Sequence, residues 1–222
     1  MSGIYDAIAM GCQYTVRLAI TGVDACISAH ALWLTAAARD MPPVLPLLGH
    51  WAQLKLANGR FDGDVRARVD EPLPFIDDAF DLVLLRHVLE VAPASQSLLQ
   101  EAVRVLAPGG MLVITGIHPL SGWLPWAYWR GRGKAWSLTS PLKLEHWLRR
   151  AELDIEGVRR VGRWWPGSET RLYGERAMGG GYLLIARKRR RMAIPIRLRP
   201  KAVPTRVHTG LAPGTRRSTV GE

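Results

Sequence analysis

Two histidines stand just after apolar runs, where their side chains could move protons. His87 follows the apolar residues 83–85 and the charged Arg86. His118 comes three residues after the apolar run at 111–115. An imidazole titrates near neutral pH, so either ring could take a proton from an oxygen or nitrogen atom of a bound molecule. Each histidine could instead be a structural residue whose ring is satisfied by backbone groups.

Asp70 and Glu71 form a second group of candidates, just before a Leu-Pro-Phe segment. Their carboxylates could accept hydrogen bonds from a ligand, or they could form a solvated acidic turn. Asp77, Asp78 and Asp81 follow in a further acidic loop. We predict no metal site, because hard cations need more convergent oxygen ligands than one such loop supplies.

The elements that would position these side chains are readable from hydrophobic periodicity. Residues 83–85 are an apolar run short enough for a strand buried on both faces. Apolar residues then recur at helical spacing over 97–106, with Glu101 and Arg104 turned outward, and a Pro-Gly-Gly triplet is expected to stop this helix. Residues 111–115 are a second apolar run. The order strand, helix, strand predicts a βαβ unit with parallel strands.

The order of motifs within this unit is also specific. The chain reads Leu-Pro-Phe, an acidic turn, Phe-Asp-Leu-Val, a helix containing Glu-x-x-Arg-Val-Leu, and Pro-Gly-Gly before a strand. Together these pieces resemble the second half of a class I S-adenosylmethionine-dependent methyltransferase of the methyltransferase type 11 kind. The alternative is a βαβ unit of another α/β fold. The resemblance implies an α/β fold with a doubly wound, mostly parallel, Rossmann-like sheet and an antiparallel last strand.

The rest of the chain can be divided on the same basis. We expect strands at residues 31–34, 51–57, 64–69, 80–85, 155–165 and 181–188, and a helix at residues 142–151. Residues 1–30 are expected to be an apolar helical segment and residues 31–188 the methyltransferase-like domain. Residues 189–222 are rich in prolines and charges without periodicity, which is typical of a disordered tail.

The resemblance further implies a binding site for S-adenosylmethionine at the carboxyl ends of the strands, where open α/β sheets hold ligands. Asp70 would accept a hydrogen bond from the adenine amino group. Members of the family have a glycine-rich turn after the first strand and an acidic residue ending the second. Here residues 35–40 contain no glycine and residues 57–59 no carboxylate. The candidate cofactor-binding residues are Thr35, Asn58, Asp70, Glu71 and Arg86, and the candidate catalytic residues are His87 and His118.

Tryptophans cluster in the second half of the chain. Five of the nine fall between positions 123 and 147, interleaved with Arg130, Arg132 and Lys134. By resemblance this segment would cover the pocket of a small-molecule acceptor, and aromatic and basic side chains suit an apolar or anionic one. It could also be an amphipathic patch on a membrane surface, or a short helix packed on the sheet edge.

The net charge of +11 is concentrated at the carboxyl end. From position 187 onward there are eleven Lys or Arg and one acidic residue, so the remainder carries about +1. Residues 187–217 could contact nucleic acid, a ribosome or an anionic membrane, or could be a solvated tail. No apolar run is long enough to span a membrane, and the start does not resemble a signal peptide. Two cysteines without metal-ligand spacing favour a reducing, cytoplasmic location.

Two functions of different classes follow from these observations. The first is methyl transfer from S-adenosylmethionine to an unidentified small or medium acceptor, supported by Asp70 and the intact βαβ unit. The second is a catalytically inactive, methyltransferase-like binding protein that acts through its tryptophan-rich segment or basic tail. The turn without glycine favours the second, and the fold alone does not decide between them.

Overall fold

The computed structural model describes residues 29–36, 48–123, 125, 138–161 and 180–190. All of these belong to one unit, Met1–Arg191, and a second unit, Met192–Glu222, lies outside the described part. The predictions of a helical N-terminal segment and a disordered tail concern residues outside the described ranges, as does most of the tryptophan-rich segment. Among the described residues, no helix is long and apolar enough to cross a membrane.

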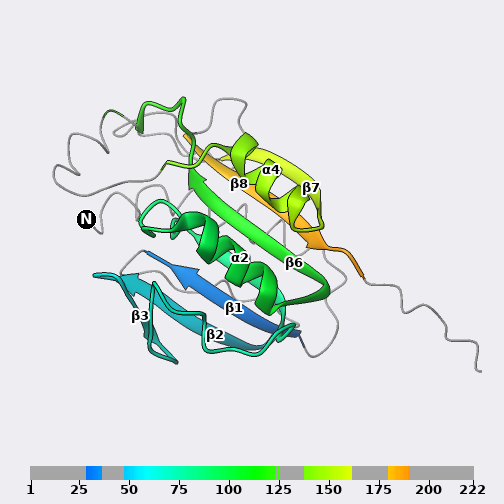
Figure 1. Cartoon of the computed structure of the whole chain (residues 1–222). Helices are drawn as coiled ribbons and strands as arrows, with labels where there is room; N and C mark the ends of the chain where they lie inside the picture. Colours follow the sequence, from blue (N-terminus) through cyan, green and yellow to red (C-terminus); the bar gives the residue numbers. More distant parts are fainter. Residues whose placement is uncertain (1–28, 37–47, 124, 126–137, 162–179, 191–222) are drawn as a thin grey trace, which may run out of the picture. The chain divides into compact units, whose positions relative to one another are not determined.

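The described strands form one eight-stranded sheet in the order β4-β3-β2-β1-β5-β6-β8-β7 (Figure 1). The four central strands β2, β1, β5 and β6 are parallel, whereas β8 is antiparallel to β6 and β7 is antiparallel to β8. This is the predicted fold class, including the antiparallel strand at the end of the sheet. The strands are β1 (Ala29–Thr35), β2 (Leu48–Ala57), β3 (Arg60–Gly63), β4 (Ala67–Arg68), β5 (Phe80–Arg86), β6 (Leu106–Ile117), β7 (Leu153–Val161) and β8 (Gly181–Lys188).

The predicted βαβ unit is confirmed. Strand β5 pairs with β6 in parallel, and helix α2 (Ser95–Val105) connects them. The helix ends before the Pro-Gly-Gly triplet, because Leu106 already has extended backbone and pairs with Phe80. The triplet lies inside β6, where a Cβ on Gly110 would come within 2.9 Å of the Asp81 carbonyl oxygen. Gly110 is therefore required for the close approach of β5 and β6 rather than for stopping the helix.

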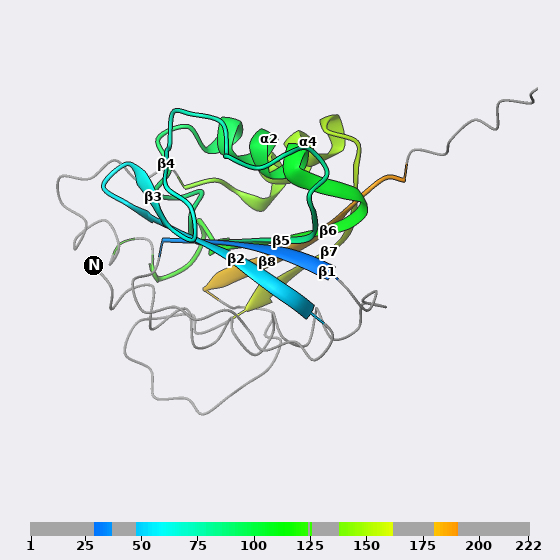
Figure 2. The same ribbon diagram turned by 90° about the horizontal axis from the view of Figure 1, so that it is seen from below.

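Helices α2 and α4 (Pro141–Arg150) cover one face of the sheet (Figure 2). Alternate residues of β5 and β6 face these two helices, and the core between sheet and helices contains Val83, Leu85, Leu112 and Ile114. The residues between them in sequence form a second apolar cluster on the opposite face. Each fully buried leucine stabilises this arrangement by about 1.5–3 kcal/mol. The burial of both faces explains why these strands are continuous apolar runs rather than alternating ones.

The prediction of a strand at residues 64–69 is wrong. The chain turns back at Asn58 and Gly59, which have φ of +51° and +74°, so the next strand, β3, is antiparallel to β2. Asn-Gly is a strong signal for a two-residue hairpin turn, because both residues tolerate the left-handed backbone region. Only Ala67 and Arg68 of the predicted range form a strand, β4.

Glu101 and Arg104 hold the Leu-Pro-Phe segment against α2, rather than pointing to solvent as predicted. The Arg104 guanidinium donates to the carbonyl oxygens of Leu73 and Phe75, each at 2.9 Å, and to both carboxylate oxygens of Glu101. Glu101 in turn accepts from the Leu73 backbone N–H at 3.0 Å. The Glu-x-x-Arg motif therefore fixes the entry into β5, and so the position of the carboxyl end of that strand.

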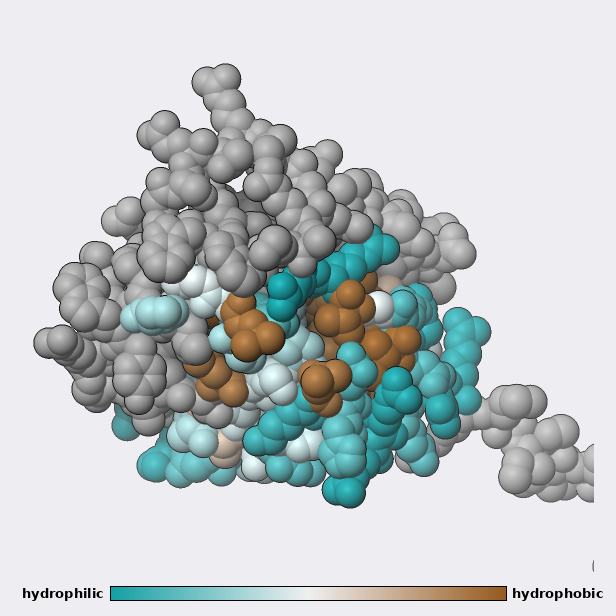
Figure 3. Space-filling view, turned by 90° about the horizontal axis from the view of Figure 1, so that it is seen from above, coloured by the Kyte–Doolittle hydropathy of each residue, from teal (hydrophilic) through white to brown (hydrophobic). Residues whose placement is uncertain are grey.

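The edge of the sheet at β7 is protected by charge. Figure 3 looks onto the side where α4 and β7 lie, and hydrophobic surface there is broken up by hydrophilic side chains. Asp154 and Glu156 on β7 form ion pairs with Arg189 and Arg187, at 2.8 Å and 2.5 Å. Charged side chains on an edge strand oppose pairing with another chain. These pairs also engage part of the basic run that was predicted to contact anionic partners.

Candidate functional site

The carboxyl ends of the central strands bring three predicted site residues together. Thr35 at the end of β1 is the cross-strand neighbour of Arg86 at the end of β5, and Arg86 is the neighbour of Thr115 on β6. All three side chains are at least 96 % buried. The Arg86 carbonyl also accepts from the Ala36 N–H at 3.2 Å. Buried polar residues therefore run across the sheet at the edge where α/β proteins bind ligands.

Arg86 points away from helices α2 and α4. It shares a sheet face with Trp33, and its guanidinium carbon lies 5.7 Å from the centroid of the Trp33 rings. This contact is a cation–π interaction in a buried setting. Within the described part of the chain, the Trp33 Nε1 and the Thr115 hydroxyl have no hydrogen-bond partner. A polar ligand at this edge would satisfy such groups, which are costly to leave unpaired in the interior.

His87 is fixed in a buried network immediately after Arg86. Its backbone N–H donates to the Thr115 carbonyl at 3.1 Å, and its backbone has a φ of +51°, a rare conformation for a residue other than glycine. The Nδ1 atom lies 3.2 Å from Oε2 of Glu90, and Oε1 of Glu90 accepts a short hydrogen bond from the Ile117 N–H. His87 and Glu90 are both at least 98 % buried.

Tyr182 on β8 is close enough to Glu90 to feel its charge. Burial, and then the nearby Glu90, raise the pKa of the Tyr182 phenol well above its usual value, so it stays protonated. Its hydroxyl donates to the Thr139 carbonyl at 3.3 Å. Sequence reasoning missed Glu90, although a His-x-x-Glu spacing at the end of a predicted strand was visible. The missing information was the contact with β6, which is distant in sequence.

His118 has a different environment. It follows β6, and its Nδ1 accepts a hydrogen bond from the Leu120 N–H at 3.1 Å. The Arg160 guanidinium lies 2.9–3.0 Å from the two ring nitrogens. Partial burial, and then the charge of Arg160, lower the pKa of the His118 imidazole. His118 is therefore neutral at neutral pH and a poor acceptor of a further proton.

The remaining predicted cofactor residues lie outward along the sheet. Asn58 is exposed in the turn between β2 and β3, and Asp70 and Glu71 follow β4, which β3 and β2 separate from β1. Both carboxylate oxygens of Asp70 accept from the Arg68 guanidinium at 3.0 Å, and this bonding lowers the Asp70 pKa. Asp70 is thus an ionised acceptor on the surface, and no recorded contact joins it to Arg86 or His87.

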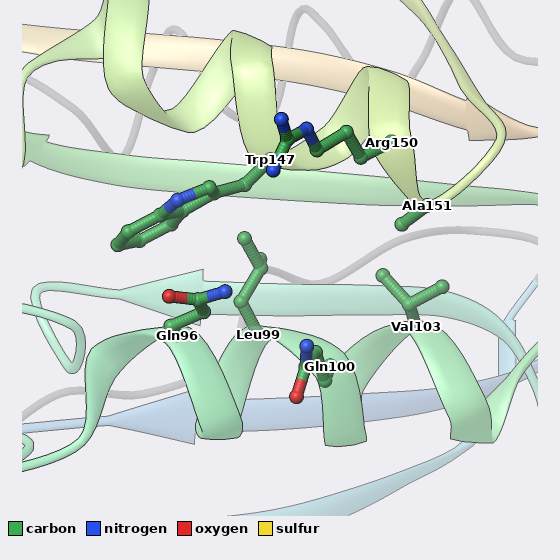
Figure 4. A pocket seen from close by; sticks show the side chains of 7 residues that line it. All are labelled: Gln96, Leu99, Gln100, Val103, Trp147, Arg150 and Ala151. Carbon is green, nitrogen blue, oxygen red and sulfur yellow. The ribbon is translucent and has the colours of Figure 1, made fainter.

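The described residues contain no metal centre, and two described cavities lie away from this edge. The described residues include no group of three or more His, Cys, Asp or Glu that could hold a metal ion. One cavity of about 290 Å³ lies between α2 and α4, and Leu99 and Trp147 project into it from opposite helices (Figure 4). A second, of about 350 Å³, is lined by charged residues near Pro108 and Lys188, at the amino end of β6. None of the predicted site residues lines either cavity.

Parts of the chain are similar in sequence to known proteins. A family model described as a methyltransferase domain matches residues 12–114. An uncharacterised protein of Escherichia coli K12, YafS, is 47 % identical over 49 residues, which are 22 % of this chain and 20 % of that protein. A phthiotriol/phenolphthiotriol dimycocerosates methyltransferase of Mycobacterium ulcerans is 41 % identical over 56 residues, 25 % of this chain and 21 % of that protein. The chain thus matches about a fifth of the length of these curated relatives.

Solved structures share the fold at low identity. The putative methyltransferase in a complex with the Trm112 methyltransferase activator of Haloferax volcanii has a TM-score of 0.59 at 16 % identity, covering 85 % of this chain and 94 % of that one. A possible histamine N-methyltransferase from Thermotoga maritima has a TM-score of 0.53 at 15 % identity, covering 84 % and 92 %. At these identities the likeness concerns the fold alone.

Proposed function

We propose that the chain, whose residues 12–114 match a family model described as a methyltransferase domain, transfers the methyl group of S-adenosylmethionine to a small or medium acceptor. The observation that supports this most is the buried polar row at the carboxyl ends of β1, β5 and β6. The Thr115 hydroxyl in this row and the Trp33 Nε1 beside it have no hydrogen-bond partner among the described residues, and a polar ligand would supply one.

The proposed donor site uses residues at both ends of this edge. Thr35 and Arg86, with the unpartnered hydroxyl of Thr115, would hold the charged amino-acid part of the donor near the sheet centre. Asp70, an ionised acceptor, would receive the adenine amino group, with Glu71 alongside and Asn58 nearer the ribose. This assignment extends the donor from β5 over β1 and β2 to the residues that follow β4, in the order of these strands in the sheet.

The donor supplies an electrophilic methyl group on a sulfonium, and the chain has to orient the acceptor for in-line attack. Orientation alone can account for a large part of such a rate, because bringing two reactants together removes most of the entropic cost. The catalytically inactive alternative shares the fold, but it offers no reason for the unpaired polar atoms of Thr115 and Trp33 at this edge.

Calorimetric titration of the full-length protein with S-adenosylmethionine tests the proposal. We expect binding to the wild type, and severalfold weaker binding to Asp70→Ala, since the variant loses the acceptor of a hydrogen bond from the adenine amino group. Asp62→Ala is the matched control, because Asp62 is another exposed acid of the same hairpin, paired with Arg66 at 3.5 Å. Absence of binding by the wild type at millimolar donor would favour the inactive binding protein.

A further inference from the structure

We propose, on the basis of the function above, that Glu90 is a positioning residue that holds His87 as the general base of the reaction. The acceptor atom is then an oxygen or nitrogen that carries a proton and loses it during methyl transfer. Phenols and amines belong to this class, whereas a carbon or thioether acceptor does not. The proposal rests on the geometry of the His87–Glu90 pair and its place in the sheet.

Both oxygens of Glu90 are engaged, so the carboxylate cannot rotate freely. Oε1 accepts from the Ile117 N–H of β6, and Oε2 lies 3.2 Å from His87 Nδ1. A carboxylate only accepts hydrogen bonds, so Nδ1 must be the nitrogen that carries the proton. Nε2 is then the nitrogen with a lone pair. This is the arrangement in which a carboxylate fixes both the tautomer and the orientation of a histidine base.

The position of the His87–Glu90 pair just after β5, and the free-energy cost of burying its carboxylate, favour a functional role. Burying a carboxylate costs several kcal/mol, and an apolar pair could join β5 to β6 without that cost. The pair also begins with a strained backbone at His87, a feature that concentrates at functional sites. It follows Arg86 directly, at the edge assigned to the donor. Buried ionisable pairs in such positions are candidates for catalysis.

The charged and titratable groups around the two histidines separate their roles. Among the described residues, those around His87 include Glu90 on its own loop and the neighbouring Arg86, and the protonated Tyr182 from β8 lies near Glu90. A carboxylate partner stabilises the imidazolium that forms when the base takes a proton. His118 instead faces the Arg160 guanidinium, which opposes protonation. The structure therefore favours His87 over His118 as the base.

Methyl transfer forms one bond, breaks another and releases one proton. A lone pair of the acceptor oxygen or nitrogen forms the new bond to the methyl carbon, and the bond from that carbon to the donor sulfur breaks. The electron pair of the broken bond stays on sulfur, giving neutral S-adenosylhomocysteine. The acceptor proton moves to Nε2 of His87, and the imidazolium is stabilised by Glu90 until the proton leaves to water.

The tautomer of His87 can be measured without any acceptor. Two-bond ¹H–¹⁵N correlation spectra of histidine-labelled full-length protein at neutral pH distinguish the protonated ring nitrogen, and His87→Gln assigns the signal. We expect the Nδ1–H tautomer in the wild type, and loss of that preference in the isosteric Glu90→Gln. A doubly protonated ring or an Nε2–H tautomer in the wild type would overturn the proposal, as would an unchanged tautomer in Glu90→Gln.

Measurement of turnover is the second test of this proposal. Release of S-adenosylhomocysteine would be measured with a panel of phenols, amines, thioethers and activated carbon acids. With phenols or amines it should fall about 10²-fold in His87→Gln and Glu90→Gln, and the affinity for the donor should be unchanged. Glu156→Gln, on the β7 edge, is the control and should behave as wild type. Transfer only to thioether or carbon acceptors would overturn the inference. Failure of the wild type to bind the donor would instead refute the proposed function, whatever the tautomer of His87.

Discussion

Replacing Arg104 by alanine should destabilise the protein more than any exposed charge would. Its guanidinium joins helix α2 to the Leu-Pro-Phe segment through two carbonyl oxygens and the Glu101 carboxylate. The bonds to Glu101, and then a 2.6 Å bond to Asp77, raise the pKa of Arg104, which therefore stays charged. The substitution leaves the Phe75 carbonyl without its recorded donor and removes the charged donor of Leu73 and Glu101, which keep only the N–H groups of Phe75 and Leu73 respectively.

The expected loss of unfolding free energy follows from the number of hydrogen bonds that Arg104 makes and from the exposure of the groups involved. Hydrogen bonds to a charged group contribute about 1.5–3 kcal/mol each when buried. The side chain of Arg104 is 29 % exposed and that of Asp77 74 % exposed, so the contact with Asp77 adds little and the others count at reduced strength. We expect a loss of about 2–3 kcal/mol, which lowers the melting temperature by about 5–10 °C for a chain of this size. Arg104→Lys should recover only part of it, because an ammonium cannot bond to all these acceptors at once.

Thermal and urea unfolding followed by circular dichroism would measure the loss. Arg149→Ala is the matched control, since Arg149 is also a helical arginine, but its contact with Glu145 is 3.9 Å long and its side chain is 72 % exposed. The control should change stability by less than about 0.5 kcal/mol. A melting temperature of Arg104→Ala within about 1 °C of the wild type would refute the role given to the Glu-x-x-Arg motif.

Three further predictions concern the sheet, pH and the tail. Gly110→Ala should cost about 1–3 kcal/mol in urea unfolding, because its Cβ would meet two backbone oxygens, whereas Gly157→Ala, with open space around it, should cost far less. The pKa of His118 is lowered from 6.5 in the fold, so its contribution to stability is present above about pH 6.5 and lost as the pH falls through the folded pKa. Unfolding free energies should therefore fall more between about pH 7.5 and 5 in the wild type than in His118→Gln; equal slopes would contradict this. Deleting residues 191–222 should abolish any salt-sensitive binding to RNA or anionic vesicles without altering the melting temperature, and unchanged vesicle pelleting would place that surface on the domain.

The sequence predicted the elements whose signals are local and repeated. Strands β5 and β6 are continuous apolar runs, and α2 has apolar residues at helical spacing, so their types and order were readable. The hairpin at Asn58 was misread because the alternation that follows it is also typical of a strand. In that case the turn signal was the stronger one, since two residues in the left-handed region reverse the chain.

The candidate site was only partly predictable, because its key contacts join residues distant in sequence. Arg86 and His87 were found from their position after an apolar run. Glu90 lies in a loop without periodicity, and its role depends on a backbone N–H of Ile117. The outward orientation predicted for Arg104 was wrong for the same reason: helical spacing does not show the segment that packs across the helix.

Transfer of a labelled methyl group tests the central claim most directly. Full-length protein would be incubated with S-adenosylmethionine carrying tritium in the methyl group and with the panel of phenols and amines, alongside His87→Gln. We expect label to appear in an acceptor, with one equivalent of S-adenosylhomocysteine formed per methyl group transferred. In His87→Gln the rate of transfer should be about 10²-fold lower. Label that stays in the donor with every acceptor, or equal rates in the two proteins, would contradict it.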